Sequence, residues 1–274
     1  MTPPVAVASP WEVRPLAEND DPRPAARPHD WDGARYDRVA GPMTGWGAST
    51  LDRLPLRGDE TVLDAGCGSG RVTEQLAERL PTGHVIALDA SPSMVAAARE
   101  RLARFGDRIR YVVADLGEPL PLDRASVDAI LSTAALHWVP DHDRVFAHLA
   151  VPLRPGGRLV AQCGGAGNIA SLRTVLAGIG DGWTGPWTFA TPEETRARLE
   201  QAGFEAIDTW LHDEPTDFEP GEPFVEYLRT VALGAHLDRL APGERDAFVA
   251  AVAAAIPDSR IDYVRLNIVA TRSG

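Results

Sequence analysis

The chain contains no lysine, so that each of its 27 basic side chains is an arginine. A Schiff-base lysine and the lysine of a phosphate-binding P-loop are therefore excluded, together with the enzyme classes that depend on them. The formal net charge is −12, and no basic run interrupts it. Such a chain is a poor partner for DNA, RNA or an anionic membrane, and we expect none of these as partners.

Cysteines and long apolar runs are also scarce. Cys67 and Cys163 give no disulfide framework, which favours a reducing, cytoplasmic setting. No apolar run has the length of a membrane-spanning helix, and the first residues do not have the pattern of a signal peptide. Cys67 lies in a glycine-rich loop, where we interpret it as a small side chain tolerated beside a ligand rather than a reactive thiol.

Proline marks the first boundary along the chain. Residues 1–28 contain seven prolines among small and charged residues. This composition predicts a flexible, extended arm. Residues 29–274 are numerous enough to form one domain with its own core.

Strands and helices then alternate in the sequence pattern. We expect strands at 62–64, 84–89, 109–114, 127–132, 158–163, 204–212 and 261–271, and helices at 71–80, 92–105, 141–153, 191–202, 223–240 and 243–255. Short, apolar, nearly unalternating strands between amphipathic helices indicate an α/β fold with a parallel sheet covered on both faces. Residues 164–190, a glycine-rich insertion after one of these strands, are expected to act as a lid.

The most informative segment is residues 61–70, with the sequence TVLDAGCGSG. An apolar run ends at Asp64, glycines follow at Gly66, Gly68 and Gly70, and a helical pattern begins at Arg71. A strand, a tight turn and a helix N-terminus in this order form a nucleotide-type cradle, although such a turn also occurs as a purely structural device. The dinucleotide motif needs a third glycine where Arg71 stands, which disfavours a nicotinamide-dependent oxidoreductase.

Two more acids follow the next two expected strands. Asp89 comes about twenty residues after the loop, where a carboxylate can accept hydrogen bonds from ribose hydroxyls or cap the next helix. Asp115 can accept a hydrogen bond from the exocyclic amine of adenine, and the backbone N–H of Leu116 can serve a ring nitrogen. The charge of Asp64 suits an ammonium group, directly or through water. Three acids placed after successive strands point to a nucleoside-containing cofactor.

A further motif makes a family resemblance specific. Residues 132–142, STAALHWVPDH, are followed by a helical stretch and by the turn Leu153-Arg154-Pro155-Gly156-Gly157, while Trp31-Asp32 and Tyr36-Asp37 stand near the start. With the glycine loop, these features resemble the class I S-adenosylmethionine-dependent methyltransferases, in the UbiE-like and trans-aconitate methyltransferase-like group, over residues 30 to 272. The resemblance implies a Rossmann-like, mostly parallel seven-stranded sheet with helical lid insertions. It also implies S-adenosylmethionine as cofactor, a core at 55–163 and a lid from 29–54, 164–190 and 221–256.

The residues expected to bind the cofactor come from the loops that follow the first four strands and from the N-terminal helices. They are Tyr36, Trp46, Asp64, Ala65, Gly66, Gly68, Gly70, Asp89, Ala90, Met94, Ala114, Asp115, Leu116, Thr133 and Ala134.

His137 is the candidate catalytic residue. As a general base, its ordinary pKa near 6.5 would suit removal of an acceptor's proton. It could instead bind a substrate oxygen, or only close the strand and orient Trp138. In the aconitate enzymes this position is typically Gln, which implies that no proton transfer is obligatory, and we therefore slightly favour the role of binding a substrate oxygen.

Tryptophans provide the candidate acceptor site. An aromatic wall attracts a sulfonium cation, and four tryptophans are expected near the same edge of the sheet: Trp138, Trp183 and Trp187, with Trp46 beside them. Core packing is the alternative for about half of them.

A metal site among His137, Asp141, His142, Asp143 and His148 is disfavoured. Asp141 is a natural helix cap, and the imidazoles would fall on different helix faces.

The function predicted from these features is methyl transfer from S-adenosylmethionine to a small molecule, at an oxygen of a carboxylate or hydroxyl. Methylation of carbon or nitrogen and a non-catalytic cofactor-binding module stay as alternatives. The acceptor's identity is open, as is the choice between monomer and homodimer.

Overall fold

The computed structural model describes residues 41–274, with side chains from Gly45 onward. Its first described element is α2 (Gly41–Leu51). The predicted proline-rich arm at 1–28, the start of the predicted lid and the candidate Tyr36 lie outside the described residues.

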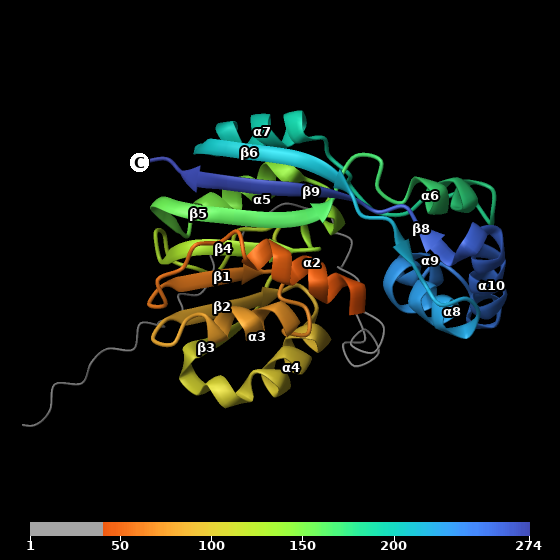
Figure 1. Cartoon of the computed structure of the whole chain (residues 1–274), viewed down its shortest axis with the longest axis horizontal. Coiled ribbons are helices and arrows are strands. Elements are labelled where there is room, and N and C mark those ends of the chain that lie inside the picture. The colour runs from red at the N-terminus through yellow and green to blue at the C-terminus, as the bar shows by residue number, and fades with distance from the viewer. Residues whose placement is uncertain (1–40) are drawn as a thin grey trace, which may run out of the picture.

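The main sheet has seven strands in the order β3-β2-β1-β4-β5-β9-β6 (Figure 1). The strands are β1 (Thr61–Ala65), β2 (His84–Asp89), β3 (Ile109–Val113), β4 (Val127–Thr133), β5 (Leu153–Gly164), β6 (Phe204–Asp213) and β9 (Val264–Arg272). The pairs among the first five strands are parallel, whereas β9 runs antiparallel to both β5 and β6. The mostly parallel seven-stranded sheet is thus confirmed, and the strand order reverses between β1 and β4, where ligands bind in such sheets.

Helices cover both faces of the sheet because successive residues of the inner strands are buried on opposite sides. Val62 belongs to the same apolar cluster as Leu76 of α3 (Arg71–Glu78), whereas its neighbour Leu63 belongs to another cluster with Phe146 of α5 (His142–Ala150). This two-sided burial explains the unalternating apolar pattern of the strands. One cluster contains residues of α2, α3 and α4 (Pro92–Arg101), and the other contains residues of α5 and α7 (Pro192–Gln201).

Two expected boundaries shift for local reasons. The helix expected to reach residue 105 ends at Arg101 and continues as a short 3-10 segment, η1 (Ala103–Arg108), in which Gly106 has the non-helical angles φ 56° and ψ −133°. Strand β5 begins at Leu153, earlier than expected, and passes through a register shift before Arg158 pairs with Ala129.

A helical group follows the fifth strand and lies beside one end of the sheet (Figure 1). Its own apolar cluster is centred on Phe224, Tyr227, Leu233 and Val249. The group comprises α6 (Ala170–Ala177), β7 (Thr216–Asp217), α8 (Glu222–Tyr227), the π-helical η3 (Leu228–Ala232), α9 (Gly234–Leu237), η4 (Pro242–Glu244), α10 (Arg245–Ala255), η5 (Pro257–Ser259) and β8 (Arg260–Ile261). The sequence pattern indicated one long helix where α8, η3 and α9 lie, and it indicated neither α6 nor the β7–β8 pair.

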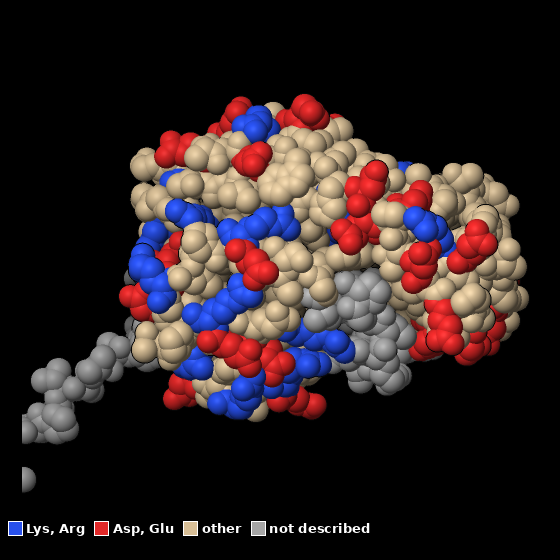
Figure 2. All heavy atoms as spheres, in the orientation of Figure 1, with Lys and Arg blue, Asp and Glu red and all other residues tan. Residues whose placement is uncertain are grey.

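Arginine and acidic side chains are intermixed on the face shown in Figure 2. Arg104 forms ion pairs with Glu74 and Glu78, and Arg79 pairs with Asp52. These acids neutralise the arginines that could otherwise attract phosphate groups. That the chain binds no nucleic acid stays a prediction. Within residues 41–274, no helix has the length and apolar character needed to cross a membrane.

Candidate active site

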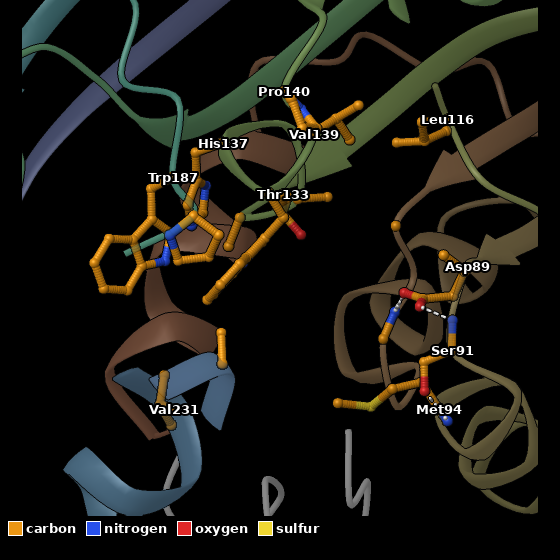
Figure 3. A pocket seen from close by; sticks show the side chains of 18 of the residues that line it. Asp89, Ser91, Met94, Leu116, Thr133, His137, Val139, Pro140, Trp187 and Val231 are labelled. Atoms are coloured by element: carbon orange, nitrogen blue, oxygen red, sulfur yellow. Dashed lines mark hydrogen bonds between the residues drawn. The ribbon is translucent and has the colours of Figure 1, made fainter. Parts of the chain in front are cut away.

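A cavity of about 660 Å³ lies at the carboxyl ends of β1 to β4, beside the helical group. This volume is in the range of small-molecule sites. Asp89 and Met94 lie on one side of the cavity and His137 and Trp187 on the other, with Thr133 between them (Figure 3). Of the predicted residues, the following line it: Trp46, Gly66, Gly68, Asp89, Ala90, Met94, Asp115, Leu116, Thr133, Ala134, His137, Trp138 and Trp187.

Two glycines of the β1–α3 turn are required for different reasons. Both have positive φ, 86° at Gly66 and 53° at Gly68. A Cβ on Gly66 would lie 2.2 Å from the Cβ of Ala135, whereas a Cβ on Gly68 would meet nothing within 4 Å. Gly66 therefore permits close packing of the turn against the segment after β4, and Gly68 leaves bare backbone at the cavity wall for a ligand.

Asp89 ties the glycine turn to the end of β2. Its Oδ2 accepts a hydrogen bond from the N–H of Gly68 at 2.9 Å, and its Oδ1 accepts one from the N–H of Ser91 at 2.9 Å (Figure 3). Ser91, not Asp89, caps α4, because the Ser91 hydroxyl accepts a hydrogen bond from the N–H of Met94 at 3.2 Å. The carboxylate is held rigidly, and each oxygen has a second lone pair with which to accept a ligand hydroxyl.

Asp115 occupies the equivalent place after β3. Its Oδ1 accepts a hydrogen bond from the N–H of Gly117 at 2.8 Å, and both Asp115 and the buried Leu116 line the cavity. The cofactor side of the cavity thus presents two fixed carboxylates from neighbouring strands, which suits a cationic ligand with hydroxyl and amine donors.

The structure contradicts the expectation that Asp64 contacts an ammonium group of the ligand directly. Its side chain is wholly buried and does not line the cavity. Because it shares a strand face with Val62, it points under α3, where the Thr73 hydroxyl donates a hydrogen bond to its Oδ2 at 2.6 Å. Burial raises the pKa of Asp64 to about 7. Three other expected cofactor residues, Ala65, Gly70 and Ala114, also lie outside the lining.

Cys67 lines the cavity, but its thiol is inert. Burial raises its pKa well above the ordinary value, and the nearby carboxylates of Asp64 and Asp89 raise it further. Little thiolate exists at neutral pH, so its interpretation as a small tolerated side chain stands.

His137 lies on η2 (Leu136–Trp138), the turn after β4, and only 8% of it is exposed. The N–H of Gly164 donates a hydrogen bond to its Nδ1 at 3.3 Å. Burial holds the pKa of His137 well below its ordinary value, with smaller contributions from Arg265 and His142. The ring is therefore neutral, and because Nδ1 is an acceptor its proton is on Nε2.

Aromatic rings form the wall beside His137. The rings of Trp138 and Trp187 are 5.8 Å apart, and Phe189 stacks on Trp187 at 6.1 Å. The expectation that Trp183 belongs to this wall is wrong. The backbone N–H of Trp183 donates a hydrogen bond to Asp181, which also pairs with Arg239 of the helical group, and Trp183 is not among the residues that line the cavity.

Trp183 instead packs against the helical group. Its ring lies 4.6 Å from that of His236, and the guanidinium of Arg239 lies 4.4 Å from its centroid. It stabilises that group rather than contacting the cavity.

Two conformationally unusual residues also line the cavity. Ala134 and Ile169 are not glycines, yet their φ angles are 56° and 50°. Positive φ at such residues costs free energy, and two of the six described non-glycine residues with positive φ line this cavity.

Strand β9 also contributes residues to the site, which was not predicted from the sequence. Arg265 is 2% exposed and lines the cavity with Tyr263, and the guanidinium of Arg265 lies 4.6 Å from the ring centroid of Trp46. A sequence signal existed: Arg265 and Asn267, two residues apart in an apolar strand, share one face at buried positions.

The polar residues after His137 have structural partners. Asp141 caps α5 by accepting a hydrogen bond from the N–H of Arg144 at 3.1 Å. His142 Nε2 lies 3.0 Å from the carbonyl of Leu136, and His148 Nδ1 lies 3.2 Å from the carbonyl of Leu116. In the part of the chain that the structure describes, no three His, Cys, Asp or Glu residues are grouped to hold a metal ion.

Comparison with known proteins decides the family. Residues 62–157 match the family model described as a methyltransferase domain. A trans-aconitate 2-methyltransferase of Variovorax paradoxus (strain S110) is 32% identical over 233 residues, covering 77% of this chain and 83% of that protein. The chain belongs to the class I S-adenosylmethionine-dependent methyltransferases. Another protein of the same name, from Methylobacterium radiotolerans, is 32% identical over 245 residues, which cover 83% of this methyltransferase and 89% of the relative.

A solved structure shows the same fold. The phosphoethanolamine N-methyltransferase 2 of Haemonchus contortus, in complex with phosphomonomethylethanolamine and S-adenosylhomocysteine, superposes with a TM-score of 0.62 at 19% identity. The match covers 88% of this methyltransferase and 57% of that longer chain. The cofactor of this methyltransferase is S-adenosylmethionine, and its methyl acceptor is a small molecule; the alternatives of an oxidoreductase and a non-catalytic module are set aside.

Proposed function

We propose that this methyltransferase esterifies a carboxylate of a small organic acid with more than one carboxylate, of the kind that trans-aconitate represents. The observation that carries the proposal is the state of His137. The residue beside the expected acceptor is a neutral hydrogen-bond donor whose other nitrogen is occupied. A carboxylate arrives ionised and needs a donor to orient it, but no base.

The names of the relatives support the same acceptor class. Both relatives described above are trans-aconitate 2-methyltransferases, and each is aligned over more than four-fifths of its length. An alcohol or carbon acid would require a base to remove its proton as it reacts, and the tautomer of His137 offers none at this position.

The cofactor-binding roles that we propose follow the geometry of the turn and the two acids. Asp89 accepts hydrogen bonds from the ribose hydroxyls, Asp115 accepts one from the adenine amine, and the backbone at Gly66 and Gly68 contacts the methionine portion. The remaining contacts come from Trp46, Ala90, Met94, Leu116, Thr133 and Ala134, all of which line the cavity.

When bound, S-adenosylmethionine supplies a methyl group on a positively charged sulfur. An acceptor oxygen forms the new C–O bond as the C–S bond breaks, so that the products are a methyl ester and neutral S-adenosylhomocysteine. No proton is transferred to or from the chain. The chain's task is to align the carboxylate behind the methyl carbon and to exclude water, and positioning of this kind is worth effective molarities of about 10⁵–10⁸ M.

We also propose that the helical group acts as the cover of the site. The helical group and the segment that leads into it contribute five apolar residues to the cavity lining: Ile169, Leu172, Val231, Ala232 and Ala235. The cytoplasmic setting and the lack of nucleic-acid partners remain predictions, and the structure contains one chain.

The test uses S-adenosylmethionine carrying a radiolabelled methyl group. Purified full-length enzyme is incubated with trans-aconitate, with the same acid reduced to its alcohol, and with an amine analogue. We expect label to transfer to trans-aconitate and to be released as volatile methanol by mild alkali, because esters hydrolyse whereas ethers and N-methyl groups do not. Alkali-stable label, or transfer to the alcohol or amine alone, would contradict the proposal.

A further inference from the structure

We propose that Arg265 determines acceptor specificity by binding a second carboxylate of the acceptor, one that is not methylated. This inference rests on the proposed function and deepens it. The guanidinium presents parallel N–H donors that match both oxygens of a carboxylate, which a point charge cannot do.

The register of the sheet places Arg265 beside His137. Arg265 on β9 pairs across the antiparallel ladder with Gly164, the last residue of β5. The N–H of Gly164 donates to Nδ1 of His137. His137, the donor for the reacting carboxylate, and Arg265, the cation for a second carboxylate, are thus both neighbours of Gly164. Both side chains line the cavity.

The side chain of Arg265 is held in place before an acceptor arrives. Its guanidinium lies against the ring of Trp46, and Trp46 in turn meets the ring of Tyr263 edge-on at 4.9 Å. Arg265 Nε donates to the side-chain oxygen of Gln162 at 3.4 Å. A cation whose side chain is already ordered loses little conformational entropy when it binds an anion.

Gln162 is itself fixed by a polar network that crosses the sheet. Its amide NH2 donates to Oδ1 of Asn267 at 3.0 Å, and Arg53 donates to the same oxygen at 2.5 Å. The Asn267 amide NH2 lies 2.9 Å from Nδ1 of His212. These contacts assign the orientation of the Gln162 amide, so that its oxygen faces Arg265.

Burial sets Arg265 apart from the other charged residues of the cavity. The acids of the lining, among them Asp89, Asp115 and Asp238, are partly or fully exposed, whereas Arg265 is the only buried arginine among the described residues. Of the two other arginines in the lining, Arg144 is exposed and pairs with Glu118 at 3.0 Å. A buried cation attracts an anion more strongly than an exposed one because solvent screens it less.

The experiment compares two acids as acceptors: trans-aconitate, with three carboxylates, and crotonate, with one. Arg265→Gln keeps a polar side chain and removes the charge, and Arg260→Gln on β8, an exposed arginine paired with Asp217, is the matched control. We expect Arg265→Gln to lower kcat/KM for trans-aconitate by about 100-fold, mostly through KM, and Arg265→Lys by about 10-fold. Turnover of crotonate should fall at least about tenfold less than that of trans-aconitate, and every parameter of Arg260→Gln should stay within about threefold of wild type. The calorimetric affinity for S-adenosylmethionine measures any loss that passes through Trp46.

Inhibition of the wild-type enzyme provides a measurement that does not depend on a variant folding. Tricarballylate, a saturated tricarboxylate, should compete with trans-aconitate about 100-fold more tightly than butyrate does. Equal inhibition by the two acids would overturn the second carboxylate site, as would equal losses of kcat/KM for trans-aconitate and crotonate in Arg265→Gln. If the wild type forms no alkali-labile ester from any acid, the proposed function fails; if esters form but Arg265→Gln keeps wild-type selectivity, only this inference fails.

Discussion

The backbone N–H of Gly164 donates a hydrogen bond to Nδ1 of His137 across 3.3 Å, which fixes the chemistry available to that imidazole. With Nδ1 accepting, the proton lies on Nε2, and the only way for the ring to take up another proton is to give up the bond to Gly164. Burial and the positive charge of Arg265 both oppose an imidazolium there. The position therefore demands a neutral donor, a role that a glutamine amide also fills.

We predict that His137→Gln retains activity whereas His137→Leu does not. The amide keeps an N–H for the acceptor oxygen, so kcat/KM should remain within about tenfold of wild type, and loss of the donor in the leucine variant should cost about 100-fold. Because the pKa of His137 lies well below 6.5, kcat/KM of the wild type should show no inflection near that pH. An inflection near 6.5 that disappears in His137→Gln would instead make His137 a base.

The second prediction concerns Asp89 and the cofactor. Asp89→Ala removes the acceptor of the Gly68 N–H as well as the proposed ribose contacts, so S-adenosylmethionine should bind at least about tenfold more weakly in a calorimetric titration. Glu205→Ala, at an exposed position of β6, is the control and should leave the affinity unchanged. Unchanged affinity in Asp89→Ala would remove Asp89 from the cofactor site.

Gly66→Ala and Gly68→Ala should fail in different ways. The new methyl group at residue 66 would overlap Ala135, so this variant should lose stability and shift the urea midpoint downward. The methyl group at residue 68 has open space around it, so Gly68→Ala should stay folded, with a cost of about 1 kcal/mol for its positive φ, yet bind the cofactor weakly. Equal affinity in Gly68→Ala and wild type would show that the cofactor does not approach this backbone.

The part of the site near β1, β2 and β3 was predictable because it is local in sequence. Asp89 is the last residue of the apolar strand β2 and Asp115 comes shortly after the end of β3, and parallel strands bring their carboxyl ends to one edge. Whether an acid faces the ligand is harder to read: Asp64 stands one residue from the strand end, and the alternation of side chains turns it under α3.

Arg265 shows what sequence patterns do not contain. Its place in the cavity depends on β9 inserting antiparallel between β5 and β6, and the partners in the β5–β9 pairing, such as Gly164 and Arg265, are about one hundred residues apart. The failed prediction for Trp183 has a similar origin, since its ring packs on His236 and Arg239, which lie far along the sequence.

The last prediction tests the buried carboxyl of Asp64 through the pH dependence of stability. Its pKa is about 7 in the folded chain and ordinary, near 3.8, in the unfolded chain. Between these values the folded state holds a proton that the unfolded state has released, so this group's contribution to the free energy of unfolding falls as the pH rises and levels off above about 7.

Asp64→Asn keeps an oxygen for the Thr73 hydroxyl but cannot ionise. Its free energy of unfolding relative to that of wild type should therefore rise by a few kcal/mol from pH 4 to 7, at about 1.4 kcal/mol per pH unit. Urea unfolding of both proteins at pH 4, 5, 6, 7 and 8 measures this difference, in which the other titrating groups cancel. A difference that is constant across the series would show that Asp64 titrates as it does in water, and that Thr73 stabilises its charged form enough to offset burial.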